Sequence, residues 1–573
     1  MVNIEVDGKI LKANENEYLI DVLKRENIDV PTLCHLKDFA PTGACRICVV
    51  EVEGEKNLIP SCSYPVKSNL TIRTNSKRVI NARKTIIELL LDNHPNDCPY
   101  CEKSIHCELL KLSRKYDIKE KTFYNYKRSK FIDSSSASIV KDTEKCILCG
   151  RCVKICEEVQ GVSCIDFIGR GSNSFIACAF DSGLNVSSCI NCGQCVMVCP
   201  TGALTVKSHI DKVLTALENP DLVVVAQHAP SVSISLGEEF NMEAGVDVQG
   251  KLTGALKKIG FNRVFDTSFS ADLTIMEEVS ELIERIRSNG PLPMFTSCSP
   301  GWIKFIEAFH PELIPNLSTC KSPQQMLGSL IKNIRPGEIN IKAKNIFSVS
   351  IMPCAAKKFE SERPEMSSRE TQDIDAVLTT REIAKIFKMK GIDLKYVPSV
   401  KDDLPFGFRS SSGKLFGTTG GVMEAAIRTA HYLLTGENLK QEELFEIRNL
   451  DGHKEIKIKI KNIELGFAVV SGIKNAQKLI KEVKNGRSDL HFIEVMTCPG
   501  GCIAGGGQPY GVDLEKIKAR MNKLYEIDKR EEIRYSHENN FVNELYKNFL
   551  EHPLSKKSHK LLHTKYISRK LIL

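Results

Sequence analysis

Residues 146–156, CILCGRCVKIC, and residues 189–200, CINCGQCVMVCP, carry the same cysteine spacing, C-x2-C-x2-C-x3-C. A repeat of this kind predicts two copies of one structural unit. The chain has 22 cysteines, and most of them precede residue 200. The first residues, MVNIEVDG, show no secretory signal, so we expect a cytoplasmic protein whose thiols stay reduced. In such a protein, tight groups of cysteines indicate metal binding rather than disulfide bonds.

The repeat resembles the cysteine motif of bacterial ferredoxins that hold two [4Fe–4S] clusters. In that arrangement, the fourth cysteine of each run ligates the cluster of the other run. The resemblance therefore implies one cluster on Cys146, Cys149, Cys152 and Cys199, and a second cluster on Cys156, Cys189, Cys192 and Cys195. Cys164 and Cys178 fit neither set, and we interpret them as ordinary buried thiols.

Upstream, residues 1–77 predict a β-hairpin around Asp7 and Gly8 and a helix over residues 18–25. Four cysteines follow with the spacing C-x10-C-x2-C-x13-C. This pattern resembles plant-type [2Fe–2S] ferredoxins, although the first gap is longer than their usual C-x4-C. The implied ligands are Cys34, Cys45, Cys48 and Cys62.

A further ligand group follows an expected helix over residues 82–92. It consists of His94, Cys98, Cys101 and Cys107. Three thiolates and one imidazole complete a tetrahedral set, which makes structural zinc one candidate. Because the group lies between two other cluster motifs, we favour a His-ligated [4Fe–4S] cluster.

Composition excludes several classes of protein. With 573 residues and 42% hydrophobic content, the chain predicts several globular domains, about four at a typical domain size. The formal charge is only +8, and we expect no nucleic-acid partner. No apolar run approaches the ~18 residues of a membrane span. Two basic stretches, residues 111–130 and 556–570, are either solvated surface or a docking patch for an acidic electron carrier.

Five cysteines remain after residue 208, far apart in the sequence. They are Cys298, Cys320, Cys354, Cys498 and Cys502. Three contexts stand out: TSCSPGW at 296–302, MPCAAKK at 352–358, and MTCPGGC at 496–502, the last followed by Gly505–Gly507. Glycine lets backbone approach a bulky group closely. Any metal site shared by these segments must be assembled by the fold.

The three segments resemble the signatures TSCCPGW, MPCxxKKxE and ExMxCxxGCxxGGGxP of [FeFe] hydrogenases. The upstream cluster order resembles the large clostridial type with four accessory clusters. In that family the H-cluster is a [4Fe–4S] cubane joined through one cysteine to a two-iron subsite that carries CO, cyanide and azadithiolate. The resemblance implies that Cys354, Cys498 and Cys502 ligate the cubane, with Cys502 as the bridge.

One position departs from the family pattern. The second cysteine of TSCCPGW is Ser299 here, so the fourth cubane ligand falls on a serine. Ser299 could bind iron as an alkoxide, a harder ligand that lowers the cluster potential. Alternatively, Cys298 takes over as the ligand, or the cubane is weakly loaded. Adjacent residues point in different directions, so we favour Ser299 ligation or a perturbed cubane.

Residues 274–287 predict a helix with an apolar stripe. Glu278 and Glu281 lie three residues apart, with Arg285 one turn further on. A solvated charged face is the usual meaning of such a trio. The resemblance implies instead a proton relay through Cys298, Glu278, Ser318, Glu281 and Arg285. Titratable groups at hydrogen-bond spacing can pass protons if burial adjusts their pKa values.

The resemblance also implies contacts to the two-iron subsite. Lys357 is assigned to a cyanide ligand, since ammonium is a compact charged donor. Ala229, Pro230, Ser231 and Gln324 are implied as further contacts to the diatomic ligands, with Met352, Phe416 and Met496 as an apolar wall.

The predicted fold is α+β and modular. Residues 1–77 are expected to form a β-grasp [2Fe–2S] ferredoxin-like domain and residues 78–125 a His/Cys3 [4Fe–4S] domain. Residues 126–208 should form a two-[4Fe–4S] ferredoxin domain, and residues 209–573 a two-lobed α/β H-cluster domain.

The expected function is a ferredoxin-linked hydrogenase, 2H⁺ + 2e⁻ ⇌ H₂, fed by one [2Fe–2S] and three accessory [4Fe–4S] clusters. The implied partners are ferredoxin or flavodoxin, and the machinery that matures the two-iron subsite. One rival is an iron–sulfur H₂ sensor or assembly protein with reduced or no turnover, which Ser299 favours. A second rival, a diaphorase-type electron-transfer subunit, leaves Cys354, Cys498 and Cys502 without a purpose.

Overall fold

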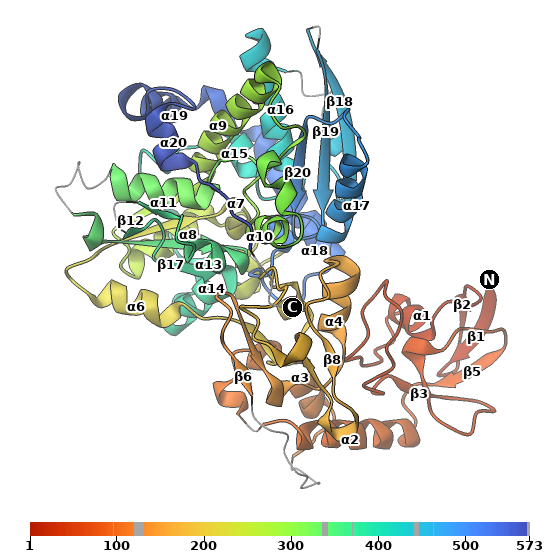
Figure 1. Cartoon of the computed structure of the whole chain (residues 1–573). Coiled ribbons are helices and arrows are strands. Elements are labelled where there is room, and N and C mark those ends of the chain that lie inside the picture. The colour runs from red at the N-terminus through yellow and green to blue at the C-terminus, as the bar shows by residue number, and fades with distance from the viewer. Residues whose placement is uncertain are drawn as a thin grey trace.

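The computed structural model describes residues 1–95, 97–119, 131–334, 342–368, 371–439, 446–461 and 463–569. Figure 1 shows the N-terminal sheet (red) at one end of the molecule and the cysteine-rich segments (orange) beside it. The large C-terminal region (yellow to blue) lies beyond them. The architecture is mixed α/β. Among the described residues, every helix is too short or too polar to cross a bilayer.

The N-terminal part is a five-stranded sheet with strand order β2-β1-β5-β3-β4. The predicted hairpin is confirmed: β1 and β2 pair antiparallel around Asp7 and Gly8, which both have positive φ, as a tight hairpin turn requires. Helix α1 packs its apolar side chains into the core of this sheet. The elements are β1 (Val2–Val6), β2 (Lys9–Ala13), α1 (Leu19–Arg25), β3 (Val49–Val52), β4 (Ile59–Pro60) and β5 (Leu70–Arg73).

The next segment holds two helices. Helix α2 (Lys77–Asp92) begins five residues before the expected start, because the Ser76 hydroxyl accepts a hydrogen bond from the Val79 amide at 3.3 Å and caps it. Helix α3 (Glu108–Lys115) begins directly after Cys107. The repeat region then forms a three-stranded sheet, β10-β7-β6, and a small β8-β9 hairpin. Its elements are β6 (Ile132–Asp133), β7 (Ile139–Asp142), α4 (Arg151–Lys154), β8 (Asp166–Ile168), β9 (Phe175–Ala177), α5 (Gln194–Val198) and β10 (Leu204–Val206).

The C-terminal region is built on two four-stranded sheets. The first, β12-β11-β14-β17, is entirely parallel. In the second, β13-β20-β19-β18, only β18 runs antiparallel to its neighbour. The strands are β11 (Val223–His228), β12 (Arg263–Asp266), β13 (Met294–Phe295), β14 (Ile346–Met352), β17 (Ala376–Thr379), β18 (His453–Ile460), β19 (Ile463–Ser471) and β20 (Phe492–Met496). Two short strands, β15 (Ser367–Ser368) and β16 (Thr371–Gln372), pair separately.

Helices lie around both sheets (Figure 1). Their bounds are α6 (Ile210–Glu218), α7 (Pro230–Ser233), α8 (Gln249–Lys258), α9 (Thr267–Ser288), α10 (Pro300–Phe309), α11 (Pro323–Asn333), α13 (Ala356–Ser361), α14 (Thr380–Met389), α15 (Ser411–Leu415), α16 (Gly421–Thr435), α17 (Ile473–Lys484), α18 (Leu514–Arg530), α19 (Asn540–Leu545) and α20 (Lys556–Leu562).

Helix α9 is longer than the expected 274–287 and much more buried. It follows β12 without a loop, because the Asp266 side chain accepts a hydrogen bond from the Ser268 amide at 2.8 Å and caps the first turn. It ends at Asn289, which adopts a left-handed conformation. Glu278 is fully buried and Glu281 is 8% exposed. The interpretation of this charged trio as a solvated face is therefore wrong.

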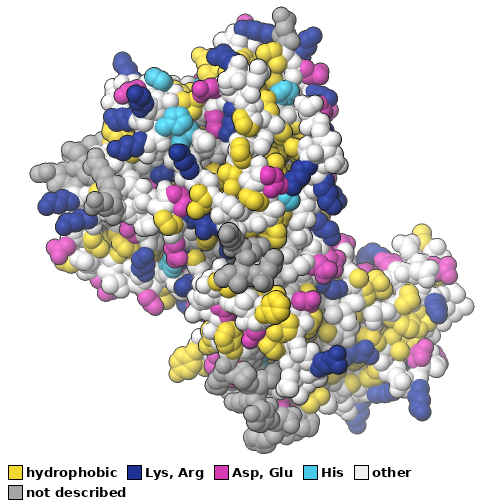
Figure 2. All heavy atoms as spheres, viewed as in Figure 1, with side chains coloured by type: hydrophobic (Ala, Val, Ile, Leu, Met, Phe, Trp, Pro, Cys, Tyr) yellow, Lys and Arg dark blue, Asp and Glu magenta, His cyan; other side chains and the backbone are white. Residues whose placement is uncertain are grey.

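The basic stretch at 111–130 is only partly visible, since residues 120–130 lie outside the described residues. In the described part, Lys115 pairs with Asp29 and Lys119 with Asp117. Figure 2 shows Lys, Arg, Asp and Glu side chains interspersed over the visible face of the molecule. These two ion pairs do not distinguish a solvated surface from a docking patch, so both interpretations stay predictions.

Candidate functional site

A cavity lies where four parallel strands of the two sheets end. Strands β11 and β14 of the first sheet lead into residues 229–231 and 352–354. Strands β13 and β20 of the second sheet lead into residues 298–301 and 496–502. Binding sites in α/β folds commonly lie at the carboxyl ends of parallel strands. The distant signature segments therefore meet because each one directly follows a strand.

The cavity brings together most of the side chains that the sequence assigned to the H-cluster. Its lining includes all eight expected cofactor contacts and the expected cubane ligands: Ala229, Pro230, Ser231, Gln324, Met352, Lys357, Phe416, Met496, Ser299, Cys354, Cys498 and Cys502. Cys298 also lines it.

Three of the thiols in the cavity wall, those of Cys354, Cys498 and Cys502, influence one another's pKa values. Burial raises the pKa of Cys498, and the nearby Cys354 and Cys502 raise it further. Burial likewise raises the pKa of Cys502, with Cys354 as the next cause. Three thiolates so close together need a cationic partner, which is what a bound metal cluster supplies.

Ser299 occupies the N-cap position of α10 but does not cap that helix. Its hydroxyl oxygen lies 2.7 Å from the Thr497 hydroxyl and accepts a hydrogen bond from the Thr497 amide at 3.3 Å. Thr497 immediately precedes Cys498 in the sequence. Two loops of the cavity wall are thereby joined at Ser299.

Behind Cys298 lies the buried carboxyl group of Glu278. Burial, and then the negative charge of Glu281, raises the pKa of Glu278 to about 8. Burial, followed by the charge of Glu278, also raises the pKa of Cys298. At neutral pH both groups therefore retain a proton, which a proton-donating site requires.

Glu281 continues this line toward the surface. The Ser318 hydroxyl donates to its Oε2 atom at 3.0 Å, and the Arg285 guanidinium donates to its Oε1 atom at 2.6 Å. Ser318, Glu281 and Arg285 are thus joined by hydrogen bonds, whereas the buried Glu278 carboxyl makes none with the described residues. Their roles as a proton relay stay a proposal.

Lys357 is held at the cavity by two acceptors. Its ammonium group donates to the Cys298 carbonyl at 3.1 Å and to Glu360 Oε2 at 2.8 Å. The same Glu360 oxygen accepts from Gln324 Nε2 at 3.1 Å. Glu360 is therefore the residue that positions both polar groups, although sequence reasoning assigned it no role. It occupies the acidic position of the MPCxxKKxE pattern, which could have revealed it.

Comparisons with known proteins cover the chain from end to end. The profile "Iron only hydrogenase large subunit, C-terminal domain" matches residues 222–506, and "Iron hydrogenase small subunit" matches residues 514–569. Three further profiles match the N-terminal part: "2Fe-2S iron-sulfur cluster binding domain" (1–77), "NADH-ubiquinone oxidoreductase-G iron-sulfur binding region" (83–122) and "NADH-quinone oxidoreductase subunit 3, ferredoxin-like domain" (136–205).

Two relatives match over nearly their full length. The NADP-reducing hydrogenase subunit HndD of Solidesulfovibrio fructosivorans is 46% identical, covering 99% of both chains. Iron hydrogenase 1 of Clostridium pasteurianum is 41% identical, covering 99% of this chain and 100% of the relative. The chain belongs to the [FeFe] hydrogenase family.

A solved structure supports the hydrogenase fold of the C-terminal region. A variant of the [FeFe]-hydrogenase HydA1 from Chlamydomonas reinhardtii matches with a TM-score of 0.58 at 39% identity, covering 63% of this chain and 99% of that chain.

A more distant relative, the cytosolic iron–sulfur assembly component 3 of Bos taurus, is 33% identical over 64% of this chain and 80% of the relative.

The cavity of this [FeFe] hydrogenase fits the family's catalytic cluster. Besides the crowded thiols, the Ser231 hydroxyl is buried in the cavity wall with no hydrogen-bond partner among the described residues. A buried hydroxyl without a partner costs folding free energy, so it indicates an acceptor that belongs in the cavity. Cys354, Cys498, Cys502 and Ser299 are the residues that can hold the cubane.

Two smaller cavities lie in the repeat region of the hydrogenase. One is lined by Cys146, Cys149, Cys152 and Cys199, and the other by Cys156, Cys189, Cys192 and Cys195. The structure therefore gathers the cysteines in the crossed sets that the ferredoxin resemblance implies. Cys164 and Cys178 are buried with their sulfur atoms 3.6 Å apart, beside the second set.

The four N-terminal thiols also converge. Contacts with Cys45 and Cys62 hold the pKa of Cys34 far below its usual value, and a contact with Cys62 lowers the pKa of Cys48. The remaining group lies on the loop between α2 and α3, where Cys98 and Cys101 are close enough to raise the pKa of Cys107 after burial. His94 is buried at the start of that loop.

Proposed function

We propose that this chain is a catalytically active, ferredoxin-linked hydrogenase of the cytoplasm, 2H⁺ + 2e⁻ ⇌ H₂. One [2Fe–2S] and three [4Fe–4S] clusters would supply its electrons. The convergence of Cys298 and three further cysteines on one cavity, with a buried carboxyl row behind them, carries this proposal. The bound H-cluster supplies the iron at which protons and electrons combine, and it requires maturation proteins for its two-iron subsite.

The residues of the chain supply the proton. Glu281 would receive it near the surface, and the Ser318 hydroxyl, which donates to Glu281 at 3.0 Å, would turn toward Glu278 to hand it on. Glu278 then passes the proton to the Cys298 sulfur at the cavity wall. A carboxyl pKa of about 8 suits this step, because the group holds a proton at neutral pH and releases it readily.

Other side chains orient the cluster and exclude water. Lys357, fixed by Glu360, presents a positive charge and donor where a cyanide ligand is expected. Ser231 and Gln324 supply polar contacts, while Met352, Phe416 and Met496 form an apolar wall. Because this apolar wall excludes water, the local dielectric constant is low and each of these electrostatic contacts is stronger.

We further propose that Ser299 ligates the cubane through its oxygen. Two donors of Thr497, the hydroxyl at 2.7 Å and the amide at 3.3 Å, lie within hydrogen-bond distance of that oxygen. Hydrogen bonds to a charged form stabilise it, so they favour an alkoxide at Ser299. The hydroxyl is also not engaged in capping its own helix.

Electron entry is proposed through the N-terminal clusters from reduced ferredoxin or flavodoxin. The relative HndD is described as an NADP-reducing hydrogenase subunit, so an NADP-linked donor is the competing arrangement. Ser299 and the likeness to an iron–sulfur assembly component favour a second candidate, an H₂ sensor or cluster-bearing protein with little turnover.

Infrared spectroscopy on anaerobically matured protein distinguishes these functions. We expect CO and cyanide bands from the two-iron subsite, absent from the unmatured control, and hydrogen evolution with reduced ferredoxin that exceeds the rate with NADPH. Bands without turnover would identify a sensor. Missing bands in protein with full cubane iron would contradict the hydrogenase proposal.

A further inference from the structure

The proposed proton relay ends on a group that cannot release protons. Arg285 donates to Glu281 at 2.6 Å, but a guanidinium keeps its proton throughout the physiological pH range. Arg285 can hold the Glu281 carboxylate in place without supplying protons to it. A group that titrates near neutral pH is needed beside Glu281.

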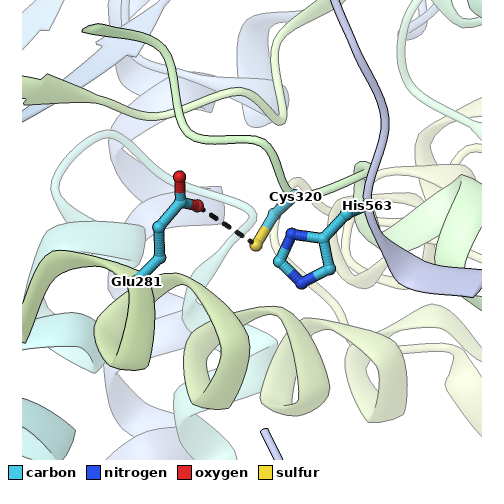
Figure 3. Close-up of side chains that lie close together, drawn as sticks. All are labelled: Glu281, Cys320 and His563. Atoms are coloured by element: carbon cyan, nitrogen blue, oxygen red, sulfur yellow. Dashed lines mark hydrogen bonds between the residues drawn. The ribbon is translucent and has the colours of Figure 1, made fainter. Parts of the chain in front are cut away.

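Figure 3 shows an imidazole and a thiol beside Glu281, where the side chains of Cys320 and His563 converge. One polar atom of each of the three residues lies within 4.8 Å of the others. The Cys320 sulfur lies 3.9 Å from Glu281 Oε2. An imidazole has an ordinary pKa near 6.5 and can both accept and donate a proton at neutral pH.

The C-terminal segment fixes His563 in this position. Backbone hydrogen bonds from Lys321 to Leu562 (2.7 Å) and from Thr564 to Thr319 (2.8 Å) attach the segment to the chain that carries Cys320. The imidazole Nδ1 atom lies 2.8 Å from the Thr319 hydroxyl. The backbone amide of Thr319 donates a hydrogen bond to Glu281. Thr319 thus holds both the ring and Glu281 in place, and the Cys320 sulfur lies close to both.

Glu277 holds the opposite side of the ring. Its Oε2 atom lies 3.1 Å from His563 Nε2, and its Oε1 atom accepts from the Tyr546 hydroxyl at 2.7 Å. Burial alone would raise the pKa of Glu277, but hydrogen bonds from His563, Ser558 and Tyr546 outweigh it and lower the pKa. Glu277 therefore stays ionised and holds the His563 ring from its Nε2 side.

His559 connects this buried ring to solvent. It lies one turn earlier, in α20, and its side chain is exposed. Its ring centroid is 4.2 Å from that of His563. Figure 2 shows histidine side chains at the surface in the region of α19 and α20.

We propose that His559 and His563 form a proton port that feeds Glu281 from the C-terminal segment. Water protonates His559, which transfers one proton to His563. His563 passes it to the Glu281 carboxylate through the Cys320 thiol, which receives one proton as it gives one up. Two such passages accompany the two electrons of each H₂, and the direction reverses during hydrogen oxidation.

This inference rests on the proposed relay, yet its test does not need turnover. The protonated Glu278 carboxyl has an infrared C=O band that shifts in D₂O and is assigned by its loss in Glu278→Gln. The rate of that shift after mixing the matured enzyme with D₂O measures proton entry.

The titratable and charged groups around the two imidazoles are Glu277, Glu281, Glu284, Arg285, Cys320 and Tyr546.

We expect His563→Gln to slow the exchange by about a hundredfold, the lower end of the range for loss of one proton-transfer group. His559→Gln should slow it several-fold, and imidazole added to the buffer should restore its rate, because free imidazole can replace an exposed ring. Hydrogen evolution should fall in parallel. The control is His552→Gln, an exposed histidine of the same segment, which should match wild type.

Unchanged exchange in His563→Gln, with iron content and thermal unfolding preserved, would refute the port. If His563→Gln fails to fold, the exposed His559 decides: a slow variant that imidazole cannot restore also refutes it. Wild-type protein that exchanges rapidly but evolves no hydrogen would instead contradict the proposed function alone.

Discussion

Ser299 differs from the family's cysteine by a single atom, an oxygen in place of a sulfur. Oxygen is a harder ligand than sulfur and favours the more oxidised state of iron. The Thr497 hydroxyl at 2.7 Å would stabilise an alkoxide there. Ligation by Ser299, as proposed, would lower the cubane potential without changing the fold.

Ser299→Cys tests this point. The cubane potential should become less negative, and viologen-driven hydrogen evolution should rise several-fold, because the cubane accepts electrons more easily from the relay. Redox titration followed by electron paramagnetic resonance measures the first effect, and gas chromatography the second. Thr497→Val is the companion variant: by removing a hydrogen bond to the Ser299 oxygen, it should lower the potential of the wild type but leave that of Ser299→Cys nearly unchanged. A revertant with wild-type potential and rate would show that Ser299 does not ligate iron.

Among the elements, the loop after β20 joins the accessory-cluster loop at Cys192 to the catalytic cavity. A Cβ atom added at Gly506 would lie 2.4 Å from the Cys192 carbonyl oxygen and 2.8 Å from Gly193 Cα. Cys192 belongs to an accessory-cluster set and also lines the catalytic cavity. Glycine is therefore required where the two cluster-binding loops touch.

Gly506→Ala should separate these two loops. We expect a lower thermal unfolding temperature and a several-fold slower hydrogen evolution with an electron donor that enters through the accessory clusters. Gly237→Ala is the matched control, because its added Cβ would meet first the flexible side chain of Met242 at 3.2 Å. Equal losses in both variants would mean that the effect is not specific to the contact between the loops.

At the scale of the whole molecule, buried side chains connect the cluster-binding segments in series. One apolar cluster contains Cys34, Cys45, Cys107 and Cys149, which come from three different ligand sets. A second apolar cluster contains Cys152, Cys189 and Cys199 together with catalytic-region residues such as Trp302 and Ala355. The N-terminal sheet, in contrast, packs around a core of its own.

Removal of residues 1–77 should therefore leave the catalytic region folded and remove the [2Fe–2S] signal from electron paramagnetic resonance spectra. Ferredoxin-driven hydrogen evolution should fall several-fold, because the carrier loses its proposed entry cluster. Viologen-driven evolution should stay near the full-length rate, since a small dye reaches the remaining clusters directly. Unchanged ferredoxin-driven turnover would place the docking surface elsewhere.

The amino-acid sequence alone determined the local chemistry of this protein. Cysteine spacing within a short loop limits where the thiols can point, so the repeat at 146–199, with its resemblance to bacterial ferredoxins, was enough to define two crossed ligand sets. The same holds for the hairpin around Asp7 and Gly8 and for the three catalytic signatures, whose residues line one cavity.

Only the tertiary structure decided how distant side chains are paired and how deeply they are buried. Helix periodicity placed Glu278 and Glu281 on one face but not in the core, since burial depends on what packs against that face. His563 joins Glu277 across 286 residues of chain, and Thr497 joins Ser299 across 198. Hydrogen bonds between such residues form only when separate strands and the C-terminal segment are packed together, and no local pattern in the sequence records that packing.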